Sequence, residues 1–206
     1  MSATGGTVFL VDDEPGMLKA LARLLEAEGF AVRAFTSAKT FLASYQADAL
    51  GCVVLDVAMP ELDGLELQQR LTQSGVLLPI VFLTGHGDIP MSVRAIKAGA
   101  LDFLTKPVKD VDLLRAVRVA LQRAVEQREL IRETALLRQR YSGLTPRERE
   151  VMAHVVAGEL NKQVADALGI GEHTVKVHRS HIMEKMGVPS LADLVRAAER
   201  LGLGKK

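Results

Sequence analysis

The chain has 206 residues, 48% of them hydrophobic and 25% charged, and a formal net charge of +1 at pH 7, which suits two soluble globular domains. The only cysteine, Cys52, excludes an internal disulfide and a cysteine-based metal site, and is expected to be a small buried apolar residue. The N-terminus lacks a signal-peptide pattern and no apolar stretch approaches the roughly 18 residues of a membrane span, so we expect a cytoplasmic protein.

The first 125 residues alternate short apolar runs with amphipathic stretches, which predicts five strand–helix units. Units in this order favour a parallel sheet with helices on both faces. The runs at 8–11, 52–55 and 80–83 are apolar at successive positions, so these strands should be central and buried. The predicted strand and helix pairs are 8–11 with 17–28, 31–35 with 38–45, 52–55 with 65–72, 80–83 with 89–98, and 101–104 with a helix beginning at 111.

The fifth helix continues to about Gln139 without a proline or glycine. Its many charged residues favour a solvated connector between two domains. A short, imperfect apolar heptad leaves a second interpretation open, a seam for a partner helix. We therefore predict a first domain over 1–125, a helical linker over 126–142 and a second domain over 143–206. The heptad consists of Leu121, Val125, Leu130, Ala135 and Leu136.

The last domain is predicted to contain only helices, over 146–157, 161–168, 172–186 and 191–201. Thr145-Pro-Arg-Glu148 and Ser190-Leu-Ala-Asp193 have the pattern of capping boxes. The turn Gly169-Ile-Gly171 between two short helices is typical of a helix-turn-helix. Residues 126–206 carry 14 Lys/Arg and 11 Asp/Glu, or +3, against 12 and 14, or −2, in residues 1–125. A basic second part suits an anionic partner, although three charges alone do not establish one.

Four polar features follow predicted strands: the pair Asp12-Asp13, Asp56, Thr84 and Lys106. Because the carboxyl ends of parallel strands meet at one edge of a sheet, we expect these side chains to converge. Crowded carboxylates suit Mg²⁺, and a lysine and a hydroxyl suit phosphoryl oxygens, so the set predicts phosphoryl transfer with an aspartate as nucleophile. Each residue alone is more commonly a turn or cap residue, and only their combination carries the prediction.

At this point the first domain resembles the receiver domain of two-component systems. The resemblance covers about residues 6–125 and implies a flavodoxin-like α/β fold with a five-stranded parallel sheet. It further implies a phosphoryl group accepted on Asp56 from a sensor histidine kinase. The motifs are Val11-Asp-Asp-Glu14, Leu55-Asp-Val-Ala-Met-Pro-Glu-Leu-Asp-Gly64, Leu83-Thr-Gly85 and Phe103-Leu-Thr-Lys-Pro107.

The resemblance also implies roles for the residues around Asp56. Asp13, Asp56 and the carbonyl of Ala58 would coordinate Mg²⁺, with help from Asp12. Thr84 and Lys106 would hold phosphoryl oxygens. Phe103 would turn inward as Thr84 moves, and the Lys106-Pro107 bond matches a position that is commonly cis. Ala58 and His86 match positions that tune dephosphorylation, although His86 is equally well explained as an exposed loop residue.

The helix predicted over 172–186 has one face for a core and one for a ligand. On a helical wheel, Val175, Ile182 and Met186 cluster within about 40° and should face the core. The opposite face includes Lys176, Val177 and Ser180, which suit the major groove, where lysine reaches guanine and valine the thymine methyl. Taken alone, this face is more simply a solvated helix surface.

The motifs around this helix favour DNA binding. Leu144-Thr-Pro-Arg-Glu-Arg-Glu-Val151, Gly158-Glu-Leu-Asn-Lys162 and Thr174-Val-Lys-Val-His178 closely resemble the LuxR/FixJ/NarL-type DNA-binding domain, over about residues 140–203. The resemblance implies a four-helix domain whose third helix reads the major groove, with a departure at Gly171, where Ser or Thr often caps this helix. The resemblance places Lys176, Val177 and Ser180 against bases. Five further residues would lie near phosphates or support the helix: Asn161, Lys162, Thr174, His178 and Arg179.

Together the two resemblances imply a phosphorylation-controlled transcription regulator that is not an enzyme. Phosphorylation would drive dimerisation or domain release, and dimers would bind two half-sites on promoter DNA and act with RNA polymerase. A phosphohydrolase with an aspartate nucleophile is disfavoured because the first strand runs into Asp12-Asp13-Glu14-Pro15, which lacks the Asp-x-Asp spacing. A nucleotide-driven enzyme is disfavoured because no Walker-type loop is present. A receiver that serves only as a dimerisation platform remains the alternative.

Overall fold

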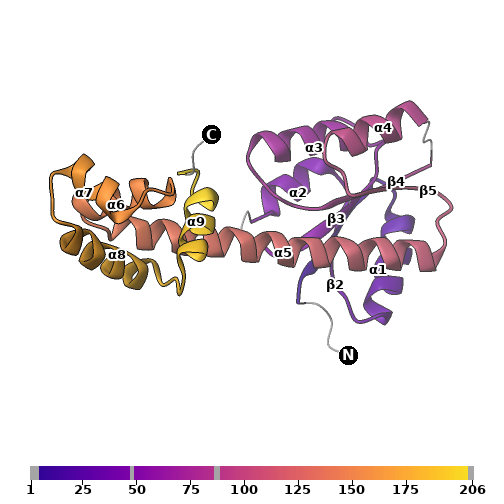
Figure 1. Ribbon diagram of the computed structural model, residues 1–206. Coiled ribbons are helices and arrows are strands. Elements are labelled where there is room, and N and C mark those ends of the chain that lie inside the picture. Colours follow the sequence, from indigo (N-terminus) through magenta and orange to yellow (C-terminus); the bar gives the residue numbers. More distant parts are fainter. Residues whose placement is uncertain (1–4, 47–48, 86–88, 204–206) are drawn as a thin grey trace. The chain divides into compact units, whose positions relative to one another are not determined.

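The computed structural model describes residues 5–46, 49–85 and 89–203. The chain divides into two compact units, Met1–Arg128 and Glu129–Lys206 (Figure 1). One helix, α5 (Asp110–Ser142), contributes to both units and contains the whole predicted linker, 126–142. Each unit is described by itself below.

The first unit contains a parallel five-stranded sheet with the strand order β2-β1-β3-β4-β5. This order is the flavodoxin-like one, so the predicted fold class is confirmed. The strands β1, β3 and β4 are central and almost wholly buried, as their continuous apolar runs predicted, whereas the edge strands β2 and β5 are partly exposed. The strands are β1 (Thr7–Val11), β2 (Ala31–Phe35), β3 (Gly51–Leu55), β4 (Ile80–Thr84) and β5 (Asp102–Thr105).

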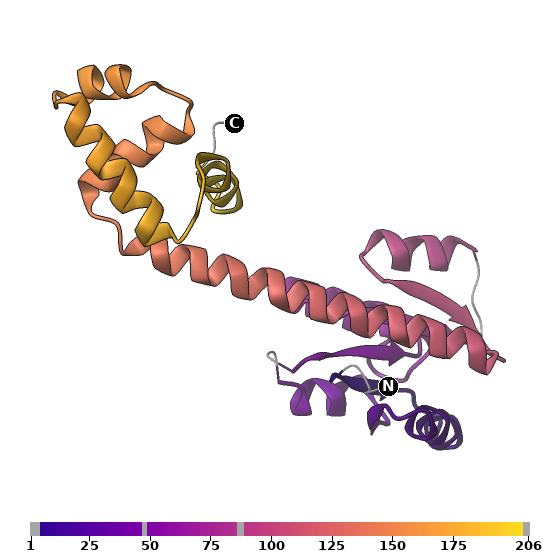
Figure 2. The same ribbon diagram turned by 60° about the horizontal axis from the view of Figure 1, so that its bottom comes forward.

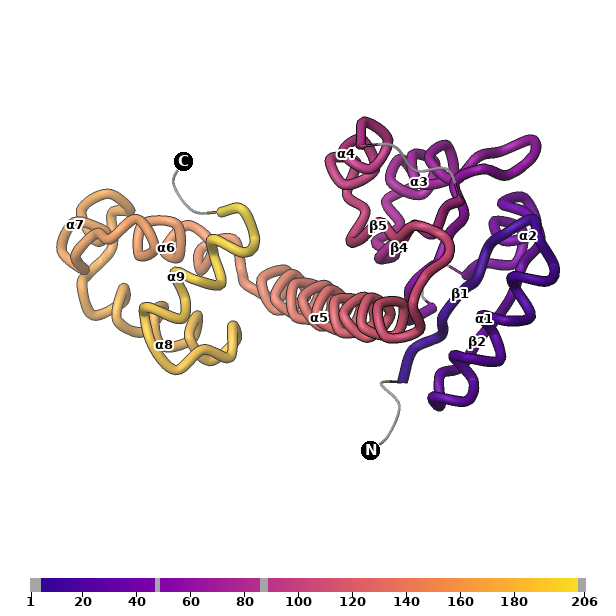
Figure 3. Tube along the Cα trace, turned by 90° about the vertical axis from the view of Figure 1, so that its right-hand side faces the viewer, coloured from indigo at the N-terminus to yellow at the C-terminus, as the bar shows by residue number. Residues whose placement is uncertain are grey.

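Helices cover both faces of this sheet, as Figures 1 and 3 show. The helices α1 and α5 bury apolar residues against one face, and α2, α3 and α4 against the other. Cys52 lies in the first of these cores, where burial raises the pKa of its thiol to about 12, so the thiol remains protonated and acts as a small apolar group. The helices not yet bounded are α1 (Pro15–Ala27), α2 (Ala38–Ser44), α3 (Gly64–Gln73) and α4 (Ile89–Lys97).

Three helices of this unit begin one or two residues earlier than predicted, namely α1, α3 and α5, the last of which begins at Asp110 rather than Val111. The helix α1 begins at Pro15 rather than Met17, because a proline is tolerated in the first turn, where its missing N–H has no intrahelical partner. The helix α3 begins at Gly64 rather than Leu65, because Asp63 and Glu66 form a capping box around its first turn.

The second unit consists of helices (Figure 2). Their common core also takes Leu137 and Tyr141 from α5. Val175, Ile182 and Met186 of α8 lie in this core, as the helical wheel predicted. The helices are α6 (Pro146–Val156), α7 (Asn161–Leu168), α8 (Glu172–Met186) and α9 (Leu191–Arg200). Among the described residues, no helix is both long enough and apolar enough to span a bilayer.

The helix caps of this unit follow the sequence with one correction. The capping box of Thr145 and Glu148 is present, and Gly171 caps α8 without a side-chain hydrogen bond. The second predicted box is only half formed. Ser190 accepts a hydrogen bond from the Asp193 N–H, but the Asp193 carboxylate accepts from the Ser190 hydroxyl and from Arg196. Aspartate is one methylene shorter than the Glu or Gln of the usual box, which explains why it binds the nearer hydroxyl.

Candidate metal centre and nucleic-acid interface

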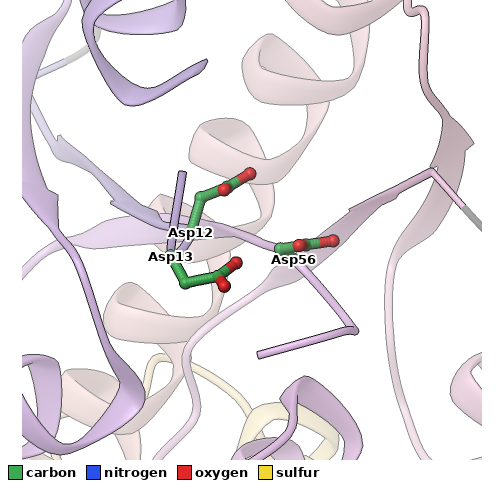
Figure 4. A group of neighbouring side chains, drawn as sticks. All are labelled: Asp12, Asp13 and Asp56. Carbon is green, nitrogen blue, oxygen red and sulfur yellow. The ribbon is translucent and has the colours of Figure 1, made fainter. Parts of the chain in front are cut away.

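Three carboxylates converge between β1 and β3, where the order in which the chain adds strands to the sheet reverses. The strands β1 and β3 are neighbours, with Val11 opposite Leu55, so the residues that follow them lie side by side at the carboxyl edge. Asp12, Asp13 and Asp56 each bring a carboxylate oxygen into a group whose members lie within 4.8 Å of one another (Figure 4). The convergence predicted from strand ends is therefore present.

Local hydrogen bonds orient two of these carboxylates. Asp12 accepts from the backbone N–H of Glu14 at 2.8 Å, and Asp56 accepts from the backbone N–H of Val57 at 2.9 Å. Asp12 and Asp56 are only 3% and 7% exposed, whereas Asp13 is exposed. The pocket thus has two fixed, buried acids and one acid open to solvent.

Lys106 enters the pocket from the end of β5. Its backbone N–H donates to the carbonyl of Thr84 at 2.7 Å, which continues the pairing of β4 with β5. Its Nζ lies 2.6 Å from Asp12 Oδ2 and 3.5 Å from Asp56 Oδ2. The Lys106-Pro107 peptide bond is cis, as the resemblance implied.

The electrostatics of the pocket favour a cation. Burial and, to a lesser degree, the nearby charge of Asp12 raise the pKa of Asp56, which Lys106 and the Val57 N–H only partly offset. Burial alone would lower the pKa of Lys106, but its hydrogen bond and charge interaction with Asp12 raise it, so the ammonium remains charged. One lysine faces three carboxylates, and hard oxygen donors of this kind fit Mg²⁺.

The predicted switch residues occupy different environments. Thr84 ends β4 and is fully buried, with Thr105 as its partner on β5. Phe103 is half-buried and packs against Phe82, with 6.0 Å between ring centroids. Ala58, the predicted carbonyl ligand, is exposed, and His86 lies outside the described residues. The roles of these residues remain predictions.

Gly64 is a residue of this site whose role the sequence did not indicate. A Cβ at this position would lie 2.3 Å from the carbonyl oxygen of Asp56, and the Gly64 N–H donates to the carbonyl of Val57 at 2.9 Å. Only glycine lets the start of α3 approach the loop after β3 this closely. The pair Asp63-Gly64 in the receiver-like motif was the available signal.

In the second unit, α8 presents the predicted base-reading face to solvent. Lys176 and Ser180 are exposed, and the large apolar Val177 is 39% exposed. Lys162, at the start of α7, and Thr174 are exposed as well. This exposure permits contact with a ligand but does not identify it.

Two other predicted contact residues are partly used inside the protein. Arg179 Nη1 donates to Asn161 Oδ1 at 2.8 Å, which joins α8 to the first turn of α7. His178 is half-buried, and its Nδ1 has no hydrogen-bond partner among the described residues. Of the two functions that the resemblance offered, phosphate contact or support of the helix, the Asn161–Arg179 pair thus performs at least the second.

An ion pair anchors the far end of α8 and was not predicted. Glu148 is 3% exposed and accepts hydrogen bonds from Lys185 Nζ at 2.8 and 2.7 Å and from the Thr145 N–H at 2.7 Å. Burial opposes the charged form, but the bonds from Lys185 and Thr145 outweigh it and lower the pKa of Glu148 to about 2. The capping-box pattern indicated Glu148, but nothing in the pattern indicated Lys185, 37 residues away.

Two protein families match the chain in succession. Residues 8–118 match the family described as response regulator receiver domain, and residues 142–198 match the family described as bacterial regulatory proteins, luxR family. The segment between the two matches, residues 119–141, lies entirely within α5.

Individual relatives match over nearly the whole chain. The response regulator protein TodT of Pseudomonas putida is 47% identical over 98% of this chain and 88% of its own length. The transcriptional regulatory protein FixJ of Bradyrhizobium diazoefficiens is 40% identical over 97% of this chain and 98% of its own. Among solved structures, the response regulator StyR is 47% identical and superposes with a TM-score of 0.82 over 95% of this chain and 98% of its own.

Proposed function

Because this chain belongs to the response regulators that join a receiver domain to a LuxR-type DNA-binding domain, we propose that phosphorylation of Asp56 controls its binding to promoter DNA. The chain is a transcriptional response regulator rather than an enzyme, as its sequence predicted. The observation that carries the proposal is the position of Lys106 Nζ, which lies between two buried carboxylates beside an exposed third.

Asp56 is the phosphoacceptor in this proposal. One of its carboxylate oxygens attacks the phosphorus of a phosphohistidine on a sensor kinase, so that a P–O bond forms while the P–N bond to the imidazole breaks. The Val57 N–H holds Asp56 Oδ1, which leaves Oδ2, on the side of Lys106, as the attacking oxygen. Asp12 is unsuited to this role because both of its oxygens already accept short hydrogen bonds.

The remaining pocket residues neutralise and orient the incoming group. Asp12, Asp13 and Asp56, with the carbonyl of Ala58, would hold Mg²⁺, which when bound supplies positive charge to the phosphoryl oxygens. Lys106 keeps its positive charge in this pocket and can transfer its hydrogen bond from a carboxylate to a phosphoryl oxygen. Thr84 would donate its hydroxyl to the same group, and Phe103 would respond to the movement of Thr84.

The second unit would read DNA through α8. Lys176, Val177 and Ser180 would meet base edges, and Lys162, Thr174 and His178 would lie near phosphates. Arg179 would support α8 through its hydrogen bond to Asn161. From the flank of α8 it would also approach the phosphate backbone of the DNA. Phosphorylated chains would dimerise, or release this unit, and then occupy two half-sites and act with RNA polymerase.

The test combines mass and DNA binding in one sample. The full chain is treated with Mg²⁺ and beryllofluoride, which mimics the phosphoryl group, and its mass is followed by light scattering with Asp56→Asn as the control. We expect the wild type alone to dimerise and to bind a selected DNA duplex more tightly. If beryllofluoride occupies Asp56 but changes neither mass nor DNA affinity, the receiver is a passive platform and the proposed control is wrong.

A further inference from the structure

The helix α8 is attached to its unit by polar contacts from three different helices. Two of these contacts were described above. Asn161 of α7 binds Arg179 near the middle of α8, and Glu148 of α6 binds Lys185 near the C-terminal end of α8. The third comes from the last turns of α5, where Arg140 Nη1 donates to the carbonyl of Met186 at 3.0 Å. Of these three helices, α5 is the one that also packs in the receiver unit.

Arg140 completes the C-terminal end of α8. Gly187 donates to the carbonyl of Glu184 at 3.0 Å, and Val188 donates to that of Met183 at 3.1 Å, in the manner of a Schellman motif. These bonds leave the Met186 carbonyl without a backbone donor, and Arg140 supplies one. A positive charge at this end of a helix is also favoured by the helix dipole.

Gly187 makes room for this contact. Its φ of +64° favours glycine, and a Cβ there would lie only 2.6 Å from Arg140 Nη1 and 2.8 Å from Arg140 Cζ. The guanidinium therefore lies directly against the backbone where α8 ends. The contact is specific to the shape of this turn, because any larger residue at 187 would displace the arginine.

The end of α5 that carries Arg140 is itself firmly held. Leu137 and Tyr141 pack in the core of this unit. Arg149 of α6 lies over the Tyr141 ring, 5.4 Å from its centroid, and donates to the carbonyl of Ser142 at 2.8 Å. These contacts join the end of α5 to α6, and Arg140 joins it to α8.

We propose that Arg140 is a positioning residue for DNA recognition, through which α5 sets the orientation of α8 and transmits the state of the receiver to it. The inference rests on the proposed function. The helix α5 starts at Asp110, four residues after Lys106 of the phosphorylation pocket, and carries Arg140 two residues before its end at Ser142. Loss of Arg140 removes the hydrogen bond from α5 to the end of α8, while the contacts with Glu148 and Asn161 keep α8 folded on its unit.

The test compares DNA affinities with and without activation. Full-length wild type, Arg140→Met, Arg140→Lys and Arg138→Met are titrated with a duplex selected from a randomised library, in Mg²⁺ with or without beryllofluoride. The quantity of interest is the ratio of the two affinities for each protein. Arg138 is the matched control, since it is exposed and lies two residues away on the same helix.

We expect a wild-type ratio of about 5 to 150, the usual range of allosteric coupling, and a ratio at least about fivefold smaller for Arg140→Met. Arg138→Met should match the wild type, and Arg140→Lys should retain most of the ratio because its ammonium can still donate to Met186. If Arg140→Met weakens both affinities by the same factor and leaves the ratio unchanged, Arg140 only stabilises the unit and the inference is overturned. A wild-type ratio of one would instead refute the proposed function, and this inference with it.

Discussion

The buried pair of Glu148 and Lys185 allows a stability prediction with a defined magnitude. The change is Glu148→Gln, which keeps the size of the side chain and an acceptor for the Thr145 N–H but removes the charge that binds Lys185. A hydrogen bond to a charged group contributes about 1.5 to 3 kcal/mol. The Lys185 side chain is 41% exposed, so water replaces part of the hydrogen bonding that it loses. We therefore expect the free energy of unfolding of the second unit to fall by about 2 kcal/mol.

The pH dependence gives a second signature of the same pair. The pKa of Glu148 is about 2 in the folded protein, below its ordinary value of 4.5, so the folded state favours the charged carboxylate. The stabilisation is therefore complete above about pH 5 and is lost as the pH falls through 4.5 towards 2. Glu148→Gln should remove this part of the acid sensitivity of the second unit.

Amide hydrogen exchange of the full chain is the suitable assay, because a two-unit chain does not guarantee two-state unfolding and exchange is assigned to peptides. Peptides from α6 and α8 should lose protection in Glu148→Gln, whereas peptides from β1 and β3 should not. The control is Glu150→Gln, on the same helix, whose exposed pair with Arg147 contributes about 0 to 1 kcal/mol. If both variants change protection equally, or if Lys185→Met adds its full effect on top of Glu148→Gln, the pair does not stabilise the fold as argued.

Three further predictions concern the two units separately. Ile182→Ala, in the fully buried core of α8, should lower the free energy of unfolding of the second unit by about 2 to 5 kcal/mol because it leaves a cavity, and hydrogen exchange that showed a loss below about 1 kcal/mol would contradict that packing. Lys106→Met should strengthen Mg²⁺ binding by about tenfold or more in calorimetry, because the Lys106 ammonium lies 2.6 and 3.5 Å from two of the carboxylates that would hold the ion and repels a second cation there; weaker binding would mean that Lys106 supports the metal site rather than competing with it. Raising the salt concentration should weaken DNA binding steeply, with a log–log slope of about −0.9 for each phosphate neutralised; Lys162→Ala should flatten this slope by about one unit, and an unchanged slope would remove Lys162 from the interface.

Much of the fold and of the acidic pocket could be predicted from the sequence because the signals are local or follow from topology. Unbroken apolar runs identified β1, β3 and β4 as buried central strands, and the alternation with helices implied a parallel sheet. Parallel strands share a carboxyl edge, so Asp12 and Asp56 had to meet although 44 positions separate them in the chain. The helical wheel likewise identified the buried face of α8, because periodicity alone decides which residues share a face.

Contacts between elements that no periodic pattern relates could not be predicted in this way. Ser190 and Asp193 show the limit even for a local pattern, since the short aspartate binds a hydroxyl and Arg196 instead of closing the box. The hydrogen bond that commits Arg179 to Asn161 depends on how α7 and α8 pack. The close approach of Gly64 to the Asp56 carbonyl depends on the path of the loop after β3.

The sequence by itself determined which residues are apolar, charged or permissive, and therefore the strands, the helices and the edge where the carboxylates gather. The tertiary structure alone decided that Lys185 pairs with Glu148 and that Arg140 binds the end of α8, and it set the distances of Lys106 from Asp12 and Asp56. The physical reason is that hydrogen bonds and ion pairs act over a few ångströms through space, so a partner 37 or 46 residues away is set by packing and leaves no regular spacing in the chain.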